Sequence, residues 1–229
     1  MLKVIVKYEK MGYSKYLGHL EMVTQIERIL RRLDLPLEYS KGYNPRPQIS
    51  FAAPLAVGVS SVGEYFEVKV TEEFDLDRIT KIDESFLPKG IEFVDAEFST
   101  NSKSIMALVK SSTYIIYSKT EKTYEEGYIR EKVKEFLDQQ EVNWVKIRKK
   151  KKPITKNIIG LINNVLVMNT SNDEIIFRVD VKTGSAGNLK PEIVLEKFSE
   201  FAGINLLNEV EIQRLEIFKE NEDKLVPII

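Results

Sequence analysis

The chain has 229 residues, of which 43% are hydrophobic and 30% are charged, and its formal net charge is −1. This composition excludes a disordered or fibrous chain, and the charge excludes a globally basic nucleic-acid binder. Cysteine is absent and histidine occurs once, which excludes disulfides, thiol nucleophiles, cysteine-ligated metal clusters and histidine-rich metal sites.

The start of the chain lacks the apolar run of a signal peptide, and no apolar run approaches the roughly 20 residues that span a bilayer. The lack of cysteine fits a reducing compartment. We therefore expect a cytoplasmic protein that does not enter a membrane and that holds no metal and no cofactor of its own.

The N-terminal half of the chain predicts four strands and two helices in the order β-α-β-β-α-β. Alternating apolar and polar residues indicate strands, and apolar residues recurring every three or four positions indicate helices. We predict strands at 2–9, 37–39, 64–70 and 91–98, and helices at 18–33 and 76–86. This order is the split βαβ, or ferredoxin-like, arrangement.

A polar segment at 99–104 separates this half from a second series of elements in a similar order. We predict strands at 112–118, 142–147, 161–168, 174–181 and 210–218, and helices at 124–140 and 191–201. The sequence therefore predicts an α+β fold of two tandem ferredoxin-like domains with antiparallel sheets. The predicted domains are residues 1–103 and 104–229.

Residues 35–58 hold four of the eight prolines, at positions 36, 45, 47 and 54. Proline fixes φ and removes a backbone donor, so this stretch predicts a rigid loop rather than a central strand. Its cationic, amide and aromatic side chains suit an unpaired RNA or a small anionic ligand. The candidates are Tyr39, Ser40, Lys41, Tyr43, Asn44, Arg46 and Gln48. The alternative is a stiff crossover with no role beyond shape.

His19 begins the helix predicted at 18–33 and is the single candidate for a catalytic histidine. A neutral imidazole there suits a general base or a hydrogen-bond donor to phosphate. Lys15 precedes it, and Arg28 belongs to a basic cluster near the end of the same helix. The alternative is a histidine that caps or packs the helix.

Residues 146–156 include seven basic residues and no acid, just after Trp144, the only tryptophan. In a chain of net charge −1, such a local patch favours a phosphate-rich partner such as RNA. The candidates here are Lys146, Arg148, Lys149, Lys150, Lys151 and Lys152. The alternative is a solvated hairpin tip.

A glycine-rich loop precedes the helix predicted at 191–201 and is typical of an anion-binding backbone nest. Its candidate residues are Gly184, Ser185, Gly187 and Asn188. The loop lacks the Gly-Lys-Ser/Thr ending of a P-loop, so a simple helix-entry turn is the alternative.

Two motifs together, Gly-His-Leu-Glu at 18–21 and Tyr-Ser-Lys-Gly-Tyr-Asn-Pro-Arg-Pro at 39–47, resemble the radical SAM-linked proteins of bacteria. Gly18 stands where that family has Ser, and Glu21 where it has Asp. The resemblance is strongest over residues 2–70. It implies a radical SAM protein as partner and a role on RNA or the translation machinery. Because the chain has no cysteine for a radical SAM cluster, the resemblance is to the free-standing form.

Three functions remain open on these residues. The first is an RNA-binding accessory protein that works with a radical SAM enzyme. The second is a metal-independent RNA endonuclease or modifying enzyme that uses His19. The third is a protein that binds a small anionic ligand in the proline-rich loop.

Overall fold

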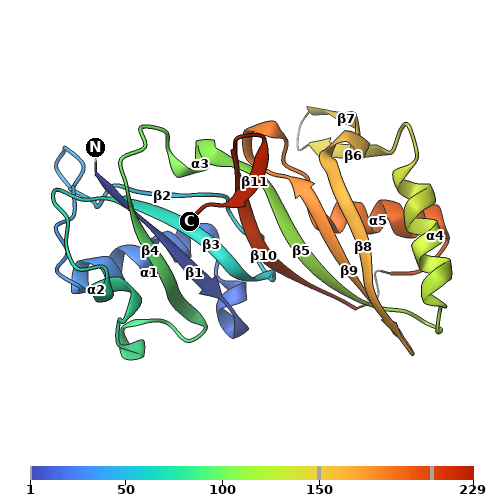
Figure 1. The fold of residues 1–229 in the computed structure, drawn as a ribbon, viewed down its shortest axis with the longest axis horizontal. Coiled ribbons are helices and arrows are strands. Elements are labelled where there is room, and N and C mark those ends of the chain that lie inside the picture. Colours follow the sequence, from blue (N-terminus) through green and yellow to red (C-terminus); the bar gives the residue numbers. More distant parts are fainter. Residues whose placement is uncertain (1, 149–150, 207–208) are drawn as a thin grey trace. The chain divides into compact units, whose positions relative to one another are not determined.

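The structure is a computed structural model that describes residues 2–148, 151–206 and 209–229. It shows a mixed α+β fold dominated by antiparallel strand pairs (Figure 1). The chain divides into two compact units: unit 1 comprises Met1–Lys110 and Arg214–Ile229, and unit 2 comprises Ser111–Gln213. The C-terminal segment, which we assigned from sequence to the second domain, therefore groups with the N-terminal unit.

Unit 1 contains a sheet whose strands follow one another in the order β4, β1, β3 and β10, with β2 also paired to β3 and β11 paired to β10. The pairs β1–β3, β1–β4, β2–β3 and β10–β11 are antiparallel. The strands are β1 (Lys3–Lys10), β2 (Ile49–Phe51), β3 (Ser60–Lys69), β4 (Ile91–Ser99), β10 (Val210–Asn221) and β11 (Lys224–Pro227). The helical elements of the unit are η1 (Gly12–Tyr16), α1 (His19–Arg32), α2 (Asp77–Thr80), η2 (Glu84–Phe86) and α3 (Ile105–Leu108).

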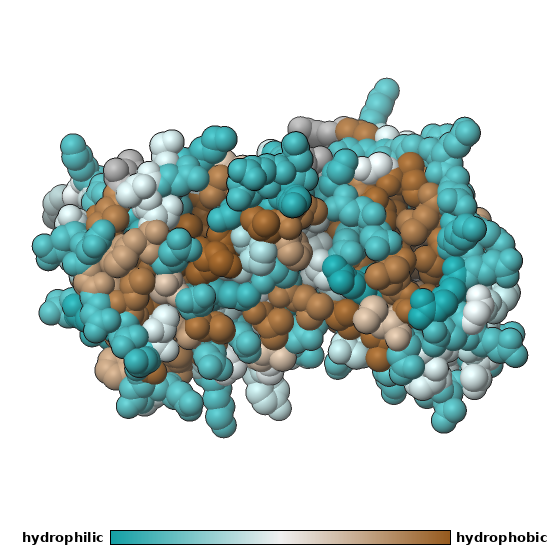
Figure 2. Space-filling view, viewed as in Figure 1, coloured by the Kyte–Doolittle hydropathy of each residue, from teal (hydrophilic) through white to brown (hydrophobic). Residues whose placement is uncertain are grey.

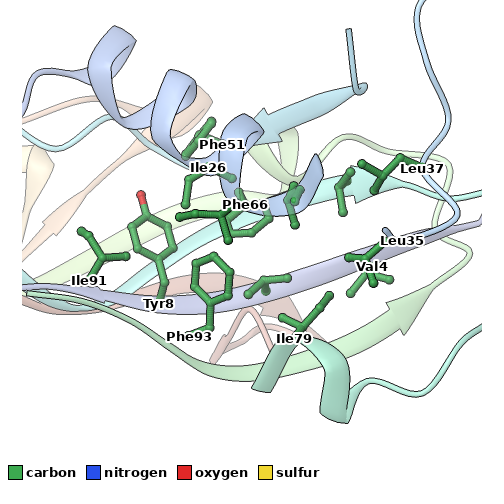
Figure 3. Close-up of a cluster of buried hydrophobic side chains, with 14 of the residues drawn as sticks. Val4, Tyr8, Ile26, Leu35, Leu37, Phe51, Phe66, Ile79, Ile91 and Phe93 are labelled. Carbon is green, nitrogen blue, oxygen red and sulfur yellow. The ribbon is translucent and has the colours of Figure 1, made fainter. Parts of the chain in front are cut away.

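Both faces of this sheet are buried, because β3 sends alternate side chains to two separate hydrophobic clusters. Phe66 and Val68 join the cluster beneath α1, together with Ile26 of that helix. Tyr65 joins the second cluster, which includes Ile217 of β10. Figure 3 shows the first cluster.

Helix α1 confirms the prediction at 18–33, and its amphipathic pattern explains it. Its residues Met22, Ile26, Ile29 and Leu30 are buried at spacings of three and four. The Gly18 backbone N–H donates to the Glu21 carboxylate over 2.6 Å and so satisfies one unpaired donor at the helix start.

Two of the predicted elements of unit 1 are wrong. The helix expected at 76–86 is two short pieces, α2 and η2, because the Asp83 carboxylate accepts the Ser85 N–H over 2.8 Å and starts a new turn. The strand expected at 37–39 is reduced to two isolated bridges, Leu37 to Val70 and Tyr39 to Pro47.

Unit 2 contains strands in the order β5, β9 and β8, and each of these pairs is antiparallel. The N-terminal end of β10 lies beside β5, where the Lys119 N–H donates to the Glu209 carbonyl over 3.0 Å. The elements are β5 (Val109–Lys119), α4 (Glu126–Leu137), β6 (Asn143–Arg148), β7 (Lys151–Asn157), η3 (Ile159–Leu161), β8 (Ile162–Ser171), β9 (Glu174–Lys182), η4 (Gly184–Ala186) and α5 (Pro191–Ala202). The sequence did not predict β7 or β11.

Aromatic rings tie the two helices of unit 2 to its sheet. Phe198 of α5 lies edge-on to Phe136 of α4 at 5.6 Å and to Phe177 of β9 at 5.7 Å between ring centroids. Some apolar surface stays exposed, and Figure 2 shows a hydrophobic area in the region of β8. Within β8, Leu166 and Met168 are exposed.

Gly63 lets β3 and β10 approach each other closely. A Cβ atom at this position would lie 2.4 Å from the Leu215 carbonyl oxygen and 2.9 Å from Glu216 Cα, which are backbone atoms that cannot turn aside. The strand pairing next to Glu64 therefore depends on glycine.

We expect Gly63→Ala to destabilise the protein by about 1–3 kcal/mol, because the added methyl group forces the two strands apart. Urea denaturation measures this loss as a lower transition midpoint. Gly160→Ala is the matched control, because apart from its chain neighbours no atom lies within 4 Å of the added Cβ and the residue is not inside an α-helix. A Gly63→Ala midpoint as high as that of the control would show that the strands adjust without cost.

Candidate functional site

His19 is the first residue of α1 and its side chain is exposed. The imidazole ring lies edge-on to Phe51 at 5.2 Å between ring centroids. Below it is a cavity of about 10 Å³, which is room for about one water. The cavity is lined by Tyr8, Lys10, His19, Met22, Phe51, Ala53, Pro54, Leu55 and Glu64.

A buried ion pair between Glu64 and Arg214 lies next to this cavity. Arg214 Nη1 donates to both oxygens of the Glu64 carboxylate, over 2.9 and 3.0 Å, and the two side chains are only 4% and 3% exposed. The same guanidinium donates to the carbonyl oxygens of Ala53 (3.1 Å) and Pro54 (3.4 Å). Multiple hydrogen bonds of this kind are what a buried charge pair requires.

Two further titratable groups surround the Glu64 carboxylate. Burial raises the pKa of Glu64, while Arg214 opposes this shift. Burial and the nearby Glu64 charge raise the pKa of Tyr8 well above its ordinary value. Burial lowers the pKa of Lys10, whose ammonium donates to the Leu17 carbonyl over 2.7 Å. Shifted groups gathered beside a histidine are typical of functional sites as well as of structural ion-pair networks.

The sequence reasoning missed Glu64 and Arg214 as a pair. Glu64 is in phase with Phe66 and Val68, which point into the core. Arg214 is likewise in phase with the buried Ile212 in β10. A charge at an inward position of an alternating strand is the signal that indicates a buried partner.

The proline-rich loop folds back on itself and is exposed at its tip. The Ser40 N–H donates to the Arg46 carbonyl (2.8 Å), and the Gln48 N–H donates to the Glu38 carbonyl (3.0 Å). The tip between them presents Lys41, Asn44 and a fully exposed Tyr43. Arg46 is also exposed, and Gln48 is half-buried, bonded to Glu38 and Lys69.

This tip lies at the opposite end of α1 from His19. Arg31, in the last turn of the helix, donates to the Pro45 carbonyl over 3.3 Å, and its guanidinium lies 5.8 Å from the Tyr39 ring centroid. A helix of 14 residues separates the two ends by about 20 Å. The tail of the same loop returns through β2 and places Phe51 and Leu55 beside His19. The predicted residues therefore fall in two places.

The other two predicted residues of this region are on α1 and just before it. Arg28 is exposed on the helix surface, and Lys15 is half-buried in η1, with its ammonium 5.4 Å from the Tyr16 ring centroid.

The basic segment of unit 2 is a hairpin of β6 and β7, which form a separate two-stranded sheet. Trp144 is paired with Lys156, and Lys146 with Ile154, so one face carries aromatic and basic side chains. Val145, paired with Thr155, is on the other face. Lys146, Lys152 and Lys156 are exposed. Arg148 and Lys151 are paired through their backbones, and Lys149 and Lys150 lie outside the described residues.

The glycine-rich loop of unit 2 is shaped largely by its own contacts. The Gly187 N–H donates to the Gly184 carbonyl over 3.3 Å. An added Cβ at Gly187 would lie 2.7 Å from Leu161 Cδ2. Ser185 and Asn188 are exposed. Helix α5 begins at Pro191, which has no N–H to offer an anion, so these contacts favour the helix-entry interpretation.

Within the described residues, no group of three or more acidic or histidine side chains is placed to hold a metal ion. The same part of the chain contains no helix that is long and apolar enough to span a membrane.

The fold is similar to that of chains in two solved protein complexes. One such chain is in a Cbf5–Nop10–Gar1 complex and another in an H/ACA RNP bound to a substrate RNA containing 2'-deoxyuridine; each is 16% identical, with a TM-score of 0.50. Each match covers 96% of this chain but only 50% and 49%, respectively, of the other chain. No curated protein matches the sequence.

The family itself is shown by sequence. Residues 3–191 match the family model described as "Uncharacterized protein conserved in bacteria (DUF2344)", and the chain belongs to this family.

We expect Glu64→Gln and Arg214→Met each to destabilise the protein by about 3–5 kcal/mol, because each leaves one buried charge without its partner. Urea denaturation of the two variants measures this. The double variant Glu64→Gln/Arg214→Met is expected to lose much less than the sum of the two, since no uncompensated charge remains.

Glu126→Gln, which breaks an exposed pair with Arg130, is the control and should change stability little. Losses that simply add in the double variant would show that Glu64 and Arg214 act independently.

Proposed function

We propose that the protein binds RNA and works as an accessory to a radical SAM enzyme, in RNA modification or in the translation machinery. The observation that carries the proposal is the β6–β7 hairpin, a separate, exposed two-stranded ribbon with basic side chains.

The hairpin forms a sheet of its own, and we assign it the role of a binding arm. An isolated two-stranded hairpin buries too little apolar surface to be stable in water by itself. Seven basic residues in an eleven-residue segment without an acid make a strong local positive field in a chain of net charge −1. Trp144 on the same face as Lys146 and Lys156 adds a ring on which a base can stack. A ring beside basic side chains suits RNA better than a polyanion that has no bases to stack.

The proline-rich loop offers a second exposed group of the same chemical kind. Lys41 and Arg46 supply positive charge, Tyr43 a fully exposed ring and Asn44 an amide. Because its backbone is fixed by prolines and by cross-loop hydrogen bonds, little conformational entropy is lost on binding. We assign both groups to RNA contact.

The comparisons support a role connected with RNA only through the fold, because the matched chains are 16% identical.

The strand order supports the assignment of a ferredoxin-like module in unit 1. Strands β1 and β2, joined through α1, lie on either side of β3, and strands β3 and β4, joined through α2, lie on either side of β1. In unit 2 the path from β5 to β8 skips β9 in the same way.

The radical SAM partner rests on the sequence resemblance over residues 2–70. Size-exclusion chromatography of the protein with the radical SAM enzyme from the same organism tests it. A common peak, with or without RNA, supports the partnership. Separate elution under both conditions would remove the partner from the proposal and leave RNA binding standing.

A second candidate is an RNA-modifying or RNA-cleaving enzyme that uses His19. The exposed His19 lines the same small cavity as Glu64, Tyr8 and Lys10. Burial shifts the pKa of each of these three neighbours, which favours this candidate. A small-ligand protein is less well supported, because the cavity beside His19 has room for about one water and the loop tip is open to solvent.

If His19 is catalytic, His19→Gln abolishes turnover of the RNA while the fold stays intact, because the side chain is exposed. Product analysis of cellular RNA by mass spectrometry measures the turnover. Turnover equal to that of the wild type would exclude His19 as acid or base.

For the hairpin, we expect Lys146→Gln/Lys152→Gln/Lys156→Gln to weaken RNA binding and to lower the slope of log affinity against log salt by about 2. Each phosphate contact to a single strand contributes ~0.7 to this slope. Fluorescence anisotropy with oligouridine across a salt series measures it.

The matched control replaces three exposed lysines elsewhere with glutamine, at Lys89, Lys122 and Lys224. It changes the net charge equally. Equal losses in the two triple variants would mean that binding follows total charge and that the hairpin has no special part in it.

A further inference from the structure

We propose that the turn η1 and the start of α1 form a platform on which unpaired nucleobases stack. This inference rests on the proposed RNA function and adds a site for bases in unit 1. The site consists of Tyr13, Tyr16, His19 and Leu20, with Lys15 beside them.

Large apolar side chains are exposed here to an unusual degree. Tyr13 is 88% exposed, Tyr16 57% and Leu20 80%, although they lie within eight residues of one another. Val57 is 62% exposed in the segment that bonds to η1. Several exposed apolar side chains within one short segment indicate an interaction surface, whereas single exposed residues do not.

The backbone that carries these side chains is held firmly on both sides. The Met11 N–H donates to the Gly90 carbonyl over 2.7 Å, and the buried Ser14 hydroxyl donates to the Lys89 carbonyl over 2.7 Å. These bonds fasten the turn to the segment that leads into β4.

Two more hydrogen bonds fasten the other side. The Gly58 N–H donates to the Lys15 carbonyl over 2.9 Å, and the buried Lys10 ammonium donates to the Leu17 carbonyl over 2.7 Å. The tyrosines are thus exposed on a fixed support. A support of this kind reduces the entropy lost when a ligand binds.

Gly90 and the backbone of Met11, just before η1, are in close contact. A Cβ atom at this position would lie 2.2 Å from the Met11 carbonyl oxygen, and Gly90 has a φ of +84°. The contact therefore requires glycine for two independent reasons, and the turn cannot shift without losing it.

The chemistry of the platform matches a nucleotide. Tyrosine and histidine rings stack on bases of any sequence, and a cation close to the ring holds the phosphate. The Lys15 ammonium lies 5.4 Å from the Tyr16 ring centroid, so ring and charge are presented together. An aliphatic partner would need no such charge, and a folded duplex would not offer free base faces.

The test compares two probes of equal length by fluorescence anisotropy: a 12-nucleotide oligouridine, and an abasic sugar-phosphate chain that has the same charge but no bases. We expect Tyr13→Ala/Tyr16→Ala to bind oligouridine at least about fivefold more weakly for each stacked base. Binding of the abasic chain should stay unchanged, because the phosphate contacts remain.

The control is Tyr128→Ala, which removes an exposed tyrosine of α4 that also has a lysine, Lys132, over its ring at 5.9 Å. It should bind both probes as the wild type does. Because Tyr13 and Tyr16 are exposed, the double variant should unfold at the wild-type urea concentration.

A second measurement uses 2-aminopurine in place of one uracil base, since its fluorescence falls on stacking. Quenching by the wild type and not by the double variant supports the platform. Wild-type affinity and quenching in the double variant would overturn it, while the salt dependence due to the hairpin would still stand. If the wild type binds neither probe, the proposed RNA function itself is wrong, and the platform is rejected with it.

Discussion

The buried ion pair between Glu64 and Arg214 is the interaction on which the structure of unit 1 depends. Its two partners are 150 residues apart in the sequence, and it joins the last long strand to β3 in the middle of the N-terminal sheet. Removing two charges from water costs several kcal/mol for each ion, so the pair does little for stability compared with an apolar contact. What it supplies is specificity: β10 has one position in which Arg214 meets a carboxylate and two carbonyl oxygens at once.

A second buried pair acts on the opposite face of the same sheet. The Lys3 ammonium donates to Glu67 over 2.8 Å and to the Lys103 carbonyl over 2.6 Å, while Glu67 also accepts the Ile105 N–H. Strand β3 therefore presents one carboxylate to each face, three residues apart. Because both carboxylates are paired inside, neither is free to bind a ligand. The exposed tyrosines and lysines of unit 1 that we propose as binding groups lie on its turns and loops instead.

Local elements could be predicted from the sequence wherever one periodic pattern decides the structure. Helix α1 and strands β1, β3 and β4 follow from their apolar spacing, and the exposed tip of the proline-rich loop follows from its prolines. Strand β7 was not predicted because Lys151 and the residues after it have no alternating pattern; only pairing with β6 makes them a strand. The partnership of Glu64 with Arg214 is a long-range contact, and no local pattern specifies it.

Under the proposed function, the two kinds of exposed group contribute differently to RNA binding. Lysines of the hairpin attract phosphate from a distance, but they cannot distinguish one unpaired segment from another. The fixed tyrosines of η1 need a free base face, but stacking alone has no long-range attraction. Under the proposed function, phosphate contacts would supply most of the affinity and its salt dependence, whereas stacking would supply the preference for unpaired RNA.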